Sequence, residues 1–452
     1  MAGRAVHAGR RARLLAQMQP GAVAVLGTAP EVLRNGDSDY PYRHDSHFYY
    51  LSGFAEPESF IVLVAAQGEH AARSILFCRE KNVEREIWEG FRFGPEAARA
   101  AFGFDEAWPI DELDARMGDI LADAPALYYA LGSGAALDAR VAGWLKAVRA
   151  RGRTGITAPQ TTHHLLSLLD EMRLLKDEHE LALMARAGVI SAQAHARAMR
   201  ATRPGMFEYE LEAELLYEFR RNGAQFPAYP SIVASGPQAC VLHYNANNRR
   251  IDDGDLVLID AGCELDGYAA DITRTYPANG RFSDAQRTLY QLVLRAQAAA
   301  LAAVSPGQPY SAIHDAAVRV LTEGMLDLGL LDRDKVGSLD DAITTRAYAQ
   351  FYMHGTGHWL GMDVHDVGAY RDLGVPDKPS RPLLPGMALT VEPGIYVRPG
   401  EGVPERFWNI GIRIEDDVVV TDAGCRILTA DVPKEVADIE TLMREALMRE
   451  TR

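Results

Sequence analysis

Two aspartates on either side of a predicted turn are the first residues in this chain that could do chemistry. Asp260 ends the apolar run 256–259, and Asp271 returns eleven residues later, after the turn-prone pair Asp266 and Gly267. A carboxylate at the end of a buried strand is costly unless it is paired or bound to a metal. Two of them on a predicted hairpin therefore indicate one shared cation site.

The same pattern occurs a second time further along the chain. Residues 254–262 align with residues 386–394: in each, a glycine turn leads into an apolar strand that ends in a carboxylate, with another glycine two residues later. Glu392 takes the place of Asp260, and Glu415 follows downstream as Asp271 does. Two hairpins that each supply two carboxylates predict a symmetric centre of four.

Three histidines lie close together in a glycine-rich segment. They are His354, His358 and His365, with glycines at 355, 357 and 361. The glycines indicate a backbone that comes close to another group. A lone buried histidine is usually an ordinary core residue, but this cluster favours one metal ligand and two accessory histidines. His243 is a fourth candidate.

Glu415 is expected to share one face of a strand with Arg413. Side chains two residues apart on a strand point the same way, and Ile412 and Ile414 take the other face. If Glu415 points into a site, Arg413 does too, where it could orient a carboxylate or meet a substrate. The alternative is a solvated strand face with an ordinary ion pair. The apolar run 418–420 that follows favours the buried arrangement.

The predicted ligand set constrains the metal. Four carboxylates and one imidazole are a hard, oxygen-rich set of ligands. Such a set suits two divalent ions, most simply Mn²⁺, and differs from the thiolate-rich set that binds structural zinc. An ordinary calcium site is the alternative, but calcium takes all-oxygen ligands, and a histidine argues against it. Two such ions about 3.5–4 Å apart would hold a water that loses a proton near neutral pH and attacks a polarised carbonyl.

Alternating strands and helices precede this centre in the chain. Strands are predicted at 23–26, 60–64, 74–78 and 126–129, and helices at 95–102, 111–122 and 137–150. A long helix is predicted from about 178 to 199, after the capping-box pair Asp177 and Glu180. Further helices are predicted over 207–222, from 283 to before Pro306, and from 311. We therefore expect an α+β protein with an α/β domain at residues 1–172 and the metal-binding domain at residues 173–452.

Composition and charge exclude several kinds of partner. The chain has 452 residues, which is long enough for two domains, and a formal net charge of −15, which argues against nucleic acid. No stretch reaches the roughly 18 consecutive apolar residues that a membrane span needs. Four widely spaced cysteines without a C-x-x-C pair indicate reduced thiols.

The first 18 residues are rich in arginine and contain no acidic residue, as some transit peptides do. They lack the apolar core of a secretory signal. Leu14, Leu15 and Met18 favour an amphipathic first helix instead. We therefore expect a cytoplasmic protein.

The motifs resemble, in order and over essentially the whole chain, those of the aminopeptidase P family. This family belongs to the pita-bread metallopeptidases, with prolidase, methionine aminopeptidase and creatinase. The matching segments are 259–262, 270–275, 354–361, 364–368, 390–394 and 412–417. The resemblance implies an amino-terminal α/β domain of the creatinase amino-domain type, followed by a pita-bread catalytic domain with a pseudo-twofold hairpin repeat.

The resemblance also implies roles for the metal ligands. Asp260 would bind one ion, Asp271 and Glu415 would bridge two, and His358 and Glu392 would complete the second. A hydroxide that bridges the ions would attack the scissile carbonyl, with Glu392 also counted among the catalytic residues.

Accessory roles follow from the same resemblance. They place His243 near the leaving nitrogen, His365 near the carbonyl oxygen that it helps to polarise, and His354 with Arg413 beside a proline pocket. Tyr229 would lie on the substrate side. Three residues of the amino-terminal domain would help to close the site of a neighbouring subunit in a dimer or tetramer: Asp37, Trp88 and Arg153.

The implied activity is removal of the first residue from peptides with proline in second position. The alternative is a prolidase, which cleaves Xaa-Pro dipeptides. The segment 87–90 and the match across the amino-terminal domain favour the first. Intact ligand positions disfavour a metal-free creatinase-like enzyme and a non-catalytic binding protein. The large amino-terminal domain disfavours methionine aminopeptidase.

Overall fold

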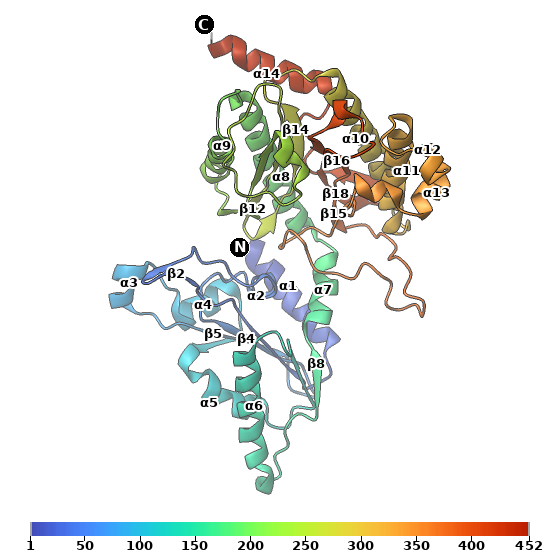
Figure 1. Cartoon of the computed structure of the whole chain (residues 1–452). Helices are drawn as coiled ribbons and strands as arrows, with labels where there is room; N and C mark the ends of the chain where they lie inside the picture. The colour runs from blue at the N-terminus through green and yellow to red at the C-terminus, as the bar shows by residue number, and fades with distance from the viewer. Residues whose placement is uncertain (1, 451–452) are drawn as a thin grey trace. The chain divides into compact units, whose positions relative to one another are not determined.

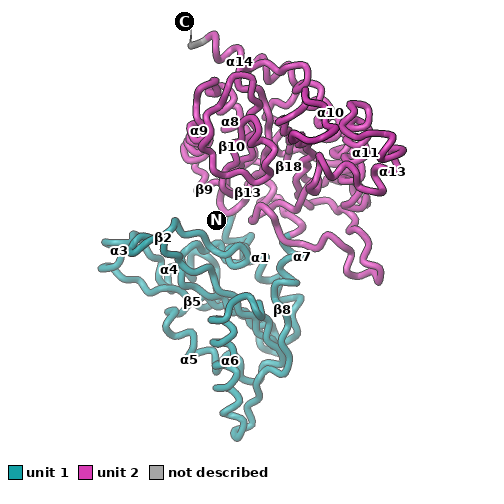
Figure 2. The backbone as a smooth tube through the Cα atoms, in the orientation of Figure 1, with its two compact units in different colours: residues 1–173 teal, residues 174–452 magenta. Residues whose placement is uncertain are grey.

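The computed structural model describes residues 2–450 and divides into two compact units, residues 1–173 and 174–452 (Figure 2). Among residues 2–450, none of the helices combines the length and the apolar character that a membrane crossing needs. All four cysteines are free, and three of them are buried.

The amino-terminal unit is built on a six-stranded mixed sheet in the order β6-β5-β4-β1-β7-β8. Its strands are β1 (Val23–Gly27), β4 (Phe60–Val64), β5 (Arg73–Cys78), β6 (Glu106–Pro109), β7 (Ala126–Tyr129) and β8 (Thr161–His164). The four inner strands are the ones that the sequence predicts, since each is a run of mostly buried apolar residues. The sequence does not predict the edge strands β6 and β8, because neither has such a run.

The helices of this unit are α1 (Ala2–Gln17), α2 (Ser46–Ser52), α3 (Val83–Glu89), α4 (Gly94–Phe102), α5 (Leu113–Ile120), α6 (Ala135–Ala150) and α7 (Leu166–Leu174). Helix α1 is the amphipathic first helix that the sequence predicts, and Leu14 and the following Met18 are buried. By contrast, α3 and the small hairpin of β2 (Leu33–Asn35) and β3 (Ser38–Asp39) bury none of their residues.

The carboxy-terminal unit contains two packed helix pairs. Helix α8 (Glu178–Ala201) packs against α9 (Glu208–Arg221), and α10 (Asp284–Ala303) packs against α11 (Ser311–Asp327). A capping box starts α8 at Asp177, as the sequence predicts, and a second one starts α10 at Ser283, where the sequence places the beginning of that helix. The shorter helices α12 (Arg333–Val336) and α13 (Leu339–Thr344) follow, and α14 (Val436–Glu450) ends the described chain.

The strands of this unit form two similar halves. In the first, β11 (Leu256–Asp260) pairs with β14 (Thr273–Pro277), and the intervening strands β12 (Cys263–Leu265) and β13 (Tyr268–Ala269) pair with each other. In the second, β15 (Ala388–Val391) pairs with β18 (Asp416–Thr421), and β16 (Gly394–Val397) pairs with β17 (Ile410–Arg413). Each half is an outer antiparallel pair joined to an inner one.

Helices and shorter strands cover these halves. Strands β10 (Ile232–Ser235), β9 (Phe226–Pro227) and β19 (Gly424–Ile427) extend the pairs. Helix α8 packs on β12 and β13 and α9 packs on β10, whereas α10 packs on β15, β16 and β17 (Figure 1). The predicted carboxylates lie at the junctions between outer and inner pairs. Asp271 lies in the bend between β13 and β14 rather than within a strand.

Candidate metal centre and catalytic cavity

A cavity of about 500 Å³ lies at the strand junctions of the two halves. Pockets of this size hold small organic ligands and short peptides. Its walls include every residue of the carboxy-terminal unit that the sequence singles out: Tyr229, His243, Asp260, Asp271, His354, His358, His365, Glu392, Arg413 and Glu415.

The strand junctions place the four carboxylates. Asp260 is the last residue of β11, and Glu392 directly follows β15. The backbone N–H of Asp271 donates to Asp417 Oδ2 at 3.0 Å, and that of Glu415 donates to the Thr273 carbonyl at 3.0 Å. Each of these bonds joins one half to the other, so the two carboxylate pairs are held together through the backbone amides of Asp271 and Glu415.

Asp260 has two strong partners. The hydroxyl of Tyr229 lies 2.6 Å from Asp260 Oδ1 and 2.5 Å from Asp271 Oδ1, and Arg413 Nη2 donates to Asp260 Oδ2 at 2.6 Å. A phenol has one proton, so Tyr229 cannot donate to both carboxylates at once. The cavity therefore holds more carboxylate oxygens than its own donors can satisfy.

The ligand atoms are close enough to share a cation. Asp271, His358 and Glu415 each place one ligand atom within 4.8 Å of the others. His358 Nε2 lies 3.4 Å from Asp271 Oδ2 and 3.8 Å from Glu392 Oε1. His358 Nδ1 donates to the Trp359 carbonyl at 3.0 Å, which leaves Nε2 facing the carboxylates.

The charges in the cavity also fit a cation. Burial, and then repulsion from Asp271, Glu392 and Asp260, raises the pKa of Glu415 well above its ordinary value. Burial raises the pKa of Glu392 to about 7 and raises that of Asp260 despite the nearby Arg413. Burial opposes the charge of His358, but Asp271 raises its pKa to about 9. The site is short of positive charge, and this donor set fits divalent metal ions.

His354 and Arg413 form a second wall. Arg413 Nη1 donates to the Tyr396 hydroxyl at 2.9 Å, and that hydroxyl lies 2.9 Å from His354 Nε2. Burial, and then the charge of Arg413, lowers the pKa of His354 to about 3, so its ring is neutral. Its Nδ1–H donates to the Gly355 carbonyl at 2.7 Å, and Nε2 accepts from Tyr396.

His365 and His243 lie on the open side of the cavity. The ring centroid of His365 is 4.1 Å from that of His358. Burial, and then the charge of His358, lowers the pKa of His365, so this ring is neutral at pH 7. Both His365 and His243 are exposed, and neither ring has a hydrogen-bond partner within residues 2–450. Both can therefore meet a ligand.

Sequence reasoning misses three residues that support the site. Thr273 donates to Glu415 Oε2 at 2.6 Å and accepts from Arg413 Nε at 3.1 Å. Tyr396 joins Arg413 to His354, and Asp417 holds the backbone of Asp271. The spacing of Thr273, two residues after Asp271, is a usable signal. The roles of Tyr396 and Asp417 depend on contacts that no local pattern announces.

The three candidates in the amino-terminal unit are exposed. Trp88 lies in α3 and is 86% exposed, Asp37 lies between β2 and β3, and Arg153 lies in a single turn at residues 152–154. Their role at a neighbouring subunit stays a prediction.

Comparisons with known proteins identify both units. The family model described as metallopeptidase family M24 matches residues 182–422, and the model described as the N-terminal domain of aminopeptidase P matches residues 7–128. The chain is 46% identical over 434 residues to the Xaa-Pro aminopeptidase of Escherichia coli (strain K12), a match that covers 96% of each protein. It is 45% identical over 438 residues to the Xaa-Pro aminopeptidase of Haemophilus influenzae, again over 96% of each.

Solved structures match over almost the full length. Aminopeptidase PepP of Pseudomonas aeruginosa matches with a TM-score of 0.95 and 49% identity, over 98% of this chain and 99% of that one. Zinc-substituted Escherichia coli aminopeptidase P in complex with product matches with a TM-score of 0.93 and 45% identity, over 98% of each. These matches confirm the predicted fold, an α/β unit followed by a pita-bread unit.

Proposed function

Because the chain belongs to metallopeptidase family M24 and begins with the amino-terminal domain of aminopeptidase P, we propose that it is an Xaa-Pro aminopeptidase. It removes the first residue from peptides that have proline in second position. The observation that carries the proposal is the single cavity that gathers four carboxylates, four histidines and Arg413 in a chain of this family.

Five residues would hold the metal: Asp260, Asp271, His358, Glu392 and Glu415. We propose two divalent ions, most simply Mn²⁺, because four carboxylates and one imidazole are mainly hard oxygen donors. When bound, the ions would supply a hydroxide nucleophile at neutral pH and polarise the scissile carbonyl. One of the similar structures is zinc-substituted, so the experiment below compares Mn²⁺ with Zn²⁺.

The substrate bond explains the need for the second wall. A bond to proline has no amide N–H, and the ring fixes the backbone next to it. An enzyme that aligned its substrate through that N–H would fail here. The wall of His354, Tyr396 and Arg413 offers a ring face, a hydroxyl and a guanidinium instead, and we assign it to the proline residue and the carbonyl beyond it.

The remaining groups handle protons. His365 is neutral at pH 7, so it can donate an N–H to the carbonyl oxygen as negative charge develops there. His243 would lie near the leaving nitrogen of proline. Glu392 would take the proton of the attacking water and pass it to the leaving nitrogen of proline. One of its carboxylate oxygens lies 3.7 Å from His354 Nδ1.

We also propose a homo-oligomer, a dimer or tetramer, that acts in the cytoplasm. Helix α3 supports an interface between copies, because it presents Val83, Ile87 and Trp88 to solvent and buries no residue. Asp37, Trp88 and Arg153 would act at the cavity of a neighbouring copy. The assembly state of purified protein, measured by light scattering with and without Trp88→Ala, tests this part of the proposal.

The experiment that tests the function compares two substrates. Metal-stripped protein is reloaded with Mn²⁺ or Zn²⁺ and offered Xaa-Pro-Xaa tripeptides and Xaa-Pro dipeptides. We expect release of the first residue from the tripeptide and slow cleavage of the dipeptide. Efficient turnover of the dipeptide alone would identify a prolidase. Full activity in excess chelator would contradict the metal assignment.

A further inference from the structure

The loop that carries His365 is held by a buried ion pair that the proposed mechanism does not use. Lys176 Nζ lies 2.9 Å from Asp366 Oδ2, and each side chain is 1% exposed. Taking two charges out of water is expensive, so a pair buried this deeply adds little net stability. Its geometry is the more informative property.

Asp366 closes the loop between the two histidines. Its backbone N–H donates to the Trp359 carbonyl at 2.8 Å, although residues 361–366 form no helix or strand. His358 precedes Trp359 and His365 precedes Asp366, so this bond brings the two histidines together, with ring centroids 4.1 Å apart. The ring of His365 makes no hydrogen bond within residues 2–450, so its position follows from its own backbone. That backbone is anchored by the adjacent Asp366.

Lys176 is anchored in turn to the second half of the pita-bread unit. Its backbone N–H donates to the Gly386 carbonyl at 2.9 Å, and Leu175 forms a bridge to Met387 directly before β15. Strand β15 leads into Glu392. One short segment therefore connects the strand that leads into Glu392, a proposed metal ligand, to the loop that carries His365.

The fit around the pair is tight. A Cβ atom on Gly361 would lie 2.2 Å from Asp366 Oδ2 and 2.9 Å from Lys176 Cε. Only glycine leaves room for the pair at this point of the loop. The sequence motif that ends at Gly361 thus accommodates the ion pair, in addition to any closeness to a substrate.

We propose that Lys176 is a positioning residue for His365. Through Asp366 it sets where the imidazole stands relative to His358 and the cavity, without touching substrate itself. The inference deepens the proposed function and, for its kinetic test, rests on it. Groups that orient active-site residues from behind typically change activity by about 10–100-fold when they are lost.

A double-mutant cycle tests this assignment. We expect Lys176→Met to lower kcat on an Xaa-Pro-Xaa tripeptide by about 10–100-fold with little change in KM. In a His365→Ala background the same change should have no further effect on kcat, because the group that Lys176 positions is already gone. An unchanged kcat in Lys176→Met, or an equal further loss in the His365→Ala background, would overturn the proposal.

A second variant separates positioning from stability. Lys176→Met removes the positive charge that faces the buried Asp366 carboxylate, which threatens folding, whereas Lys176→Met with Asp366→Leu removes both charges. We expect the double variant to melt near the wild-type temperature and still to show the low kcat. If the double variant recovered both stability and kcat, the ion pair would have only a structural role, and the proposal would be overturned. Leu321→Ala, a fully buried position on α11, is the control that loses stability but keeps kcat.

Hydrogen exchange gives a readout that needs no activity. In the charge-free double variant, amides of residues 359–366 should exchange at least tenfold faster than in the wild type, while amides of β11 keep their protection. Unchanged exchange in the loop would overturn the inference. If the wild-type protein cleaves neither peptide, the proposed function fails, and the exchange experiment still decides whether Lys176 orders this loop.

Discussion

Glu415 and Asp416 are neighbours at the start of β18, both are buried, and they have opposite surroundings. Asp416 accepts from Arg274 Nη2 and Lys434 Nζ, each at 2.7 Å, and also from Gln297 and Thr429. Glu415 accepts from one hydroxyl, that of Thr273, and otherwise faces other carboxylates. One peptide bond separates a carboxylate with two cations from one with none of its own.

The electrostatics of the two residues differ in the same way. Burial alone would raise the pKa of Asp416, but Arg274 and Lys434 hold it below its ordinary value. Burial and neighbouring carboxylates raise the pKa of Glu415 well above its ordinary value. Burial of a carboxylate is therefore not what marks a cation site. A cation site is marked instead by a buried carboxylate that has no positively charged side chain of its own.

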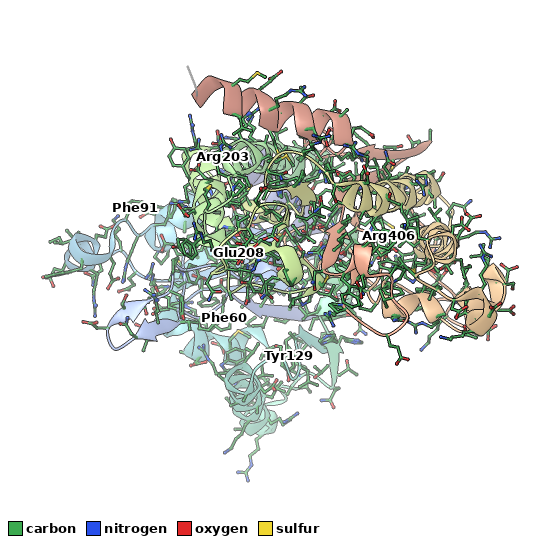
Figure 3. All side chains as sticks on the ribbon, turned by 45° about the horizontal axis from the view of Figure 1, so that its top comes forward. Phe60, Phe91, Tyr129, Arg203, Glu208 and Arg406 are labelled. Carbon is green, nitrogen blue, oxygen red and sulfur yellow. The ribbon has the colours of Figure 1, made fainter. Side chains whose placement is uncertain are left out.

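Glu208 is a second example of a satisfied buried carboxylate. It begins α9, where Figure 3 labels it, and accepts from the backbone and hydroxyl of Ser235, from Tyr244 and from the backbone of Arg249. Like Asp416, it is a structural group. Glu392, by contrast, is only partly buried, and its side chain faces the cavity with no hydrogen bond to it within residues 2–450.

The largest expected effect is the loss of a carboxylate that lines the cavity. Glu392→Ala or Asp260→Ala should abolish turnover, because each would remove a ligand of the proposed metal centre. Folding of the Glu392→Ala variant should persist, since the Glu392 side chain makes no hydrogen bond within residues 2–450. Asp260→Ala should lose some stability, because it also removes the ion pair with Arg413. Measurements of turnover, bound metal and melting temperature on each variant check this prediction. Substantial activity in either variant would contradict the two-metal assignment, and Glu323→Ala on the exposed face of α11 is the matched control.

The satisfied carboxylate should show the opposite pattern. In metal-free protein, Asp416→Asn should cost about 3–5 kcal/mol of unfolding free energy, because it leaves Arg274 and Lys434 without their buried counter-charge. Glu415→Gln should cost little, since the glutamine resembles the protonated acid that the raised pKa favours. Denaturant unfolding in excess chelator measures both. Equal losses in the two variants would show that the contrast between the neighbours is wrong.

The fold and the carboxylates could be predicted because their signals are local. Apolar runs predict the inner strands, capping residues predict α8 and α10, and a repeated strand pattern locates Asp260 and Glu392. The supporting contacts could not be predicted, because they join distant parts of the chain. Thr273 meets Glu415 across 142 positions, and Lys176 meets Asp366 across 190. Nothing in the residues near Lys176 indicates which distant carboxylate will be its partner.

His365 should affect rate and leave stability alone, the reverse of Asp416. Its ring makes no hydrogen bond within residues 2–450, so His365→Ala should barely change the melting temperature. It should lower kcat by about 10²–10³, the usual effect of losing one group that stabilises a developing oxyanion. Steady-state kinetics on a tripeptide provides the check. An unchanged kcat would remove His365 from the mechanism.

The smallest expected effect is the pH dependence that one ligand gives to metal binding, and it separates the cavity carboxylates from Asp416 once more. A cation and a proton compete for the same carboxylate, so a ligand that holds a proton weakens metal binding. Glu392 has a pKa of about 7, so it goes from mostly protonated at pH 6 to mostly ionised at pH 8. That change alone should tighten metal binding about tenfold between these two pH values.

His358 should steepen this trend. Its pKa in the metal-free protein is about 9, and it too must lose a proton before it can bind a metal ion. Asp416 should add nothing, because its pKa is held below the ordinary value and it stays ionised throughout. Titration calorimetry of Mn²⁺ in two buffers of different ionisation enthalpy counts the released protons. Binding that is equally tight at pH 6 and pH 8, with no proton release, would mean that the cavity carboxylates are already neutralised within the protein, as Asp416 is.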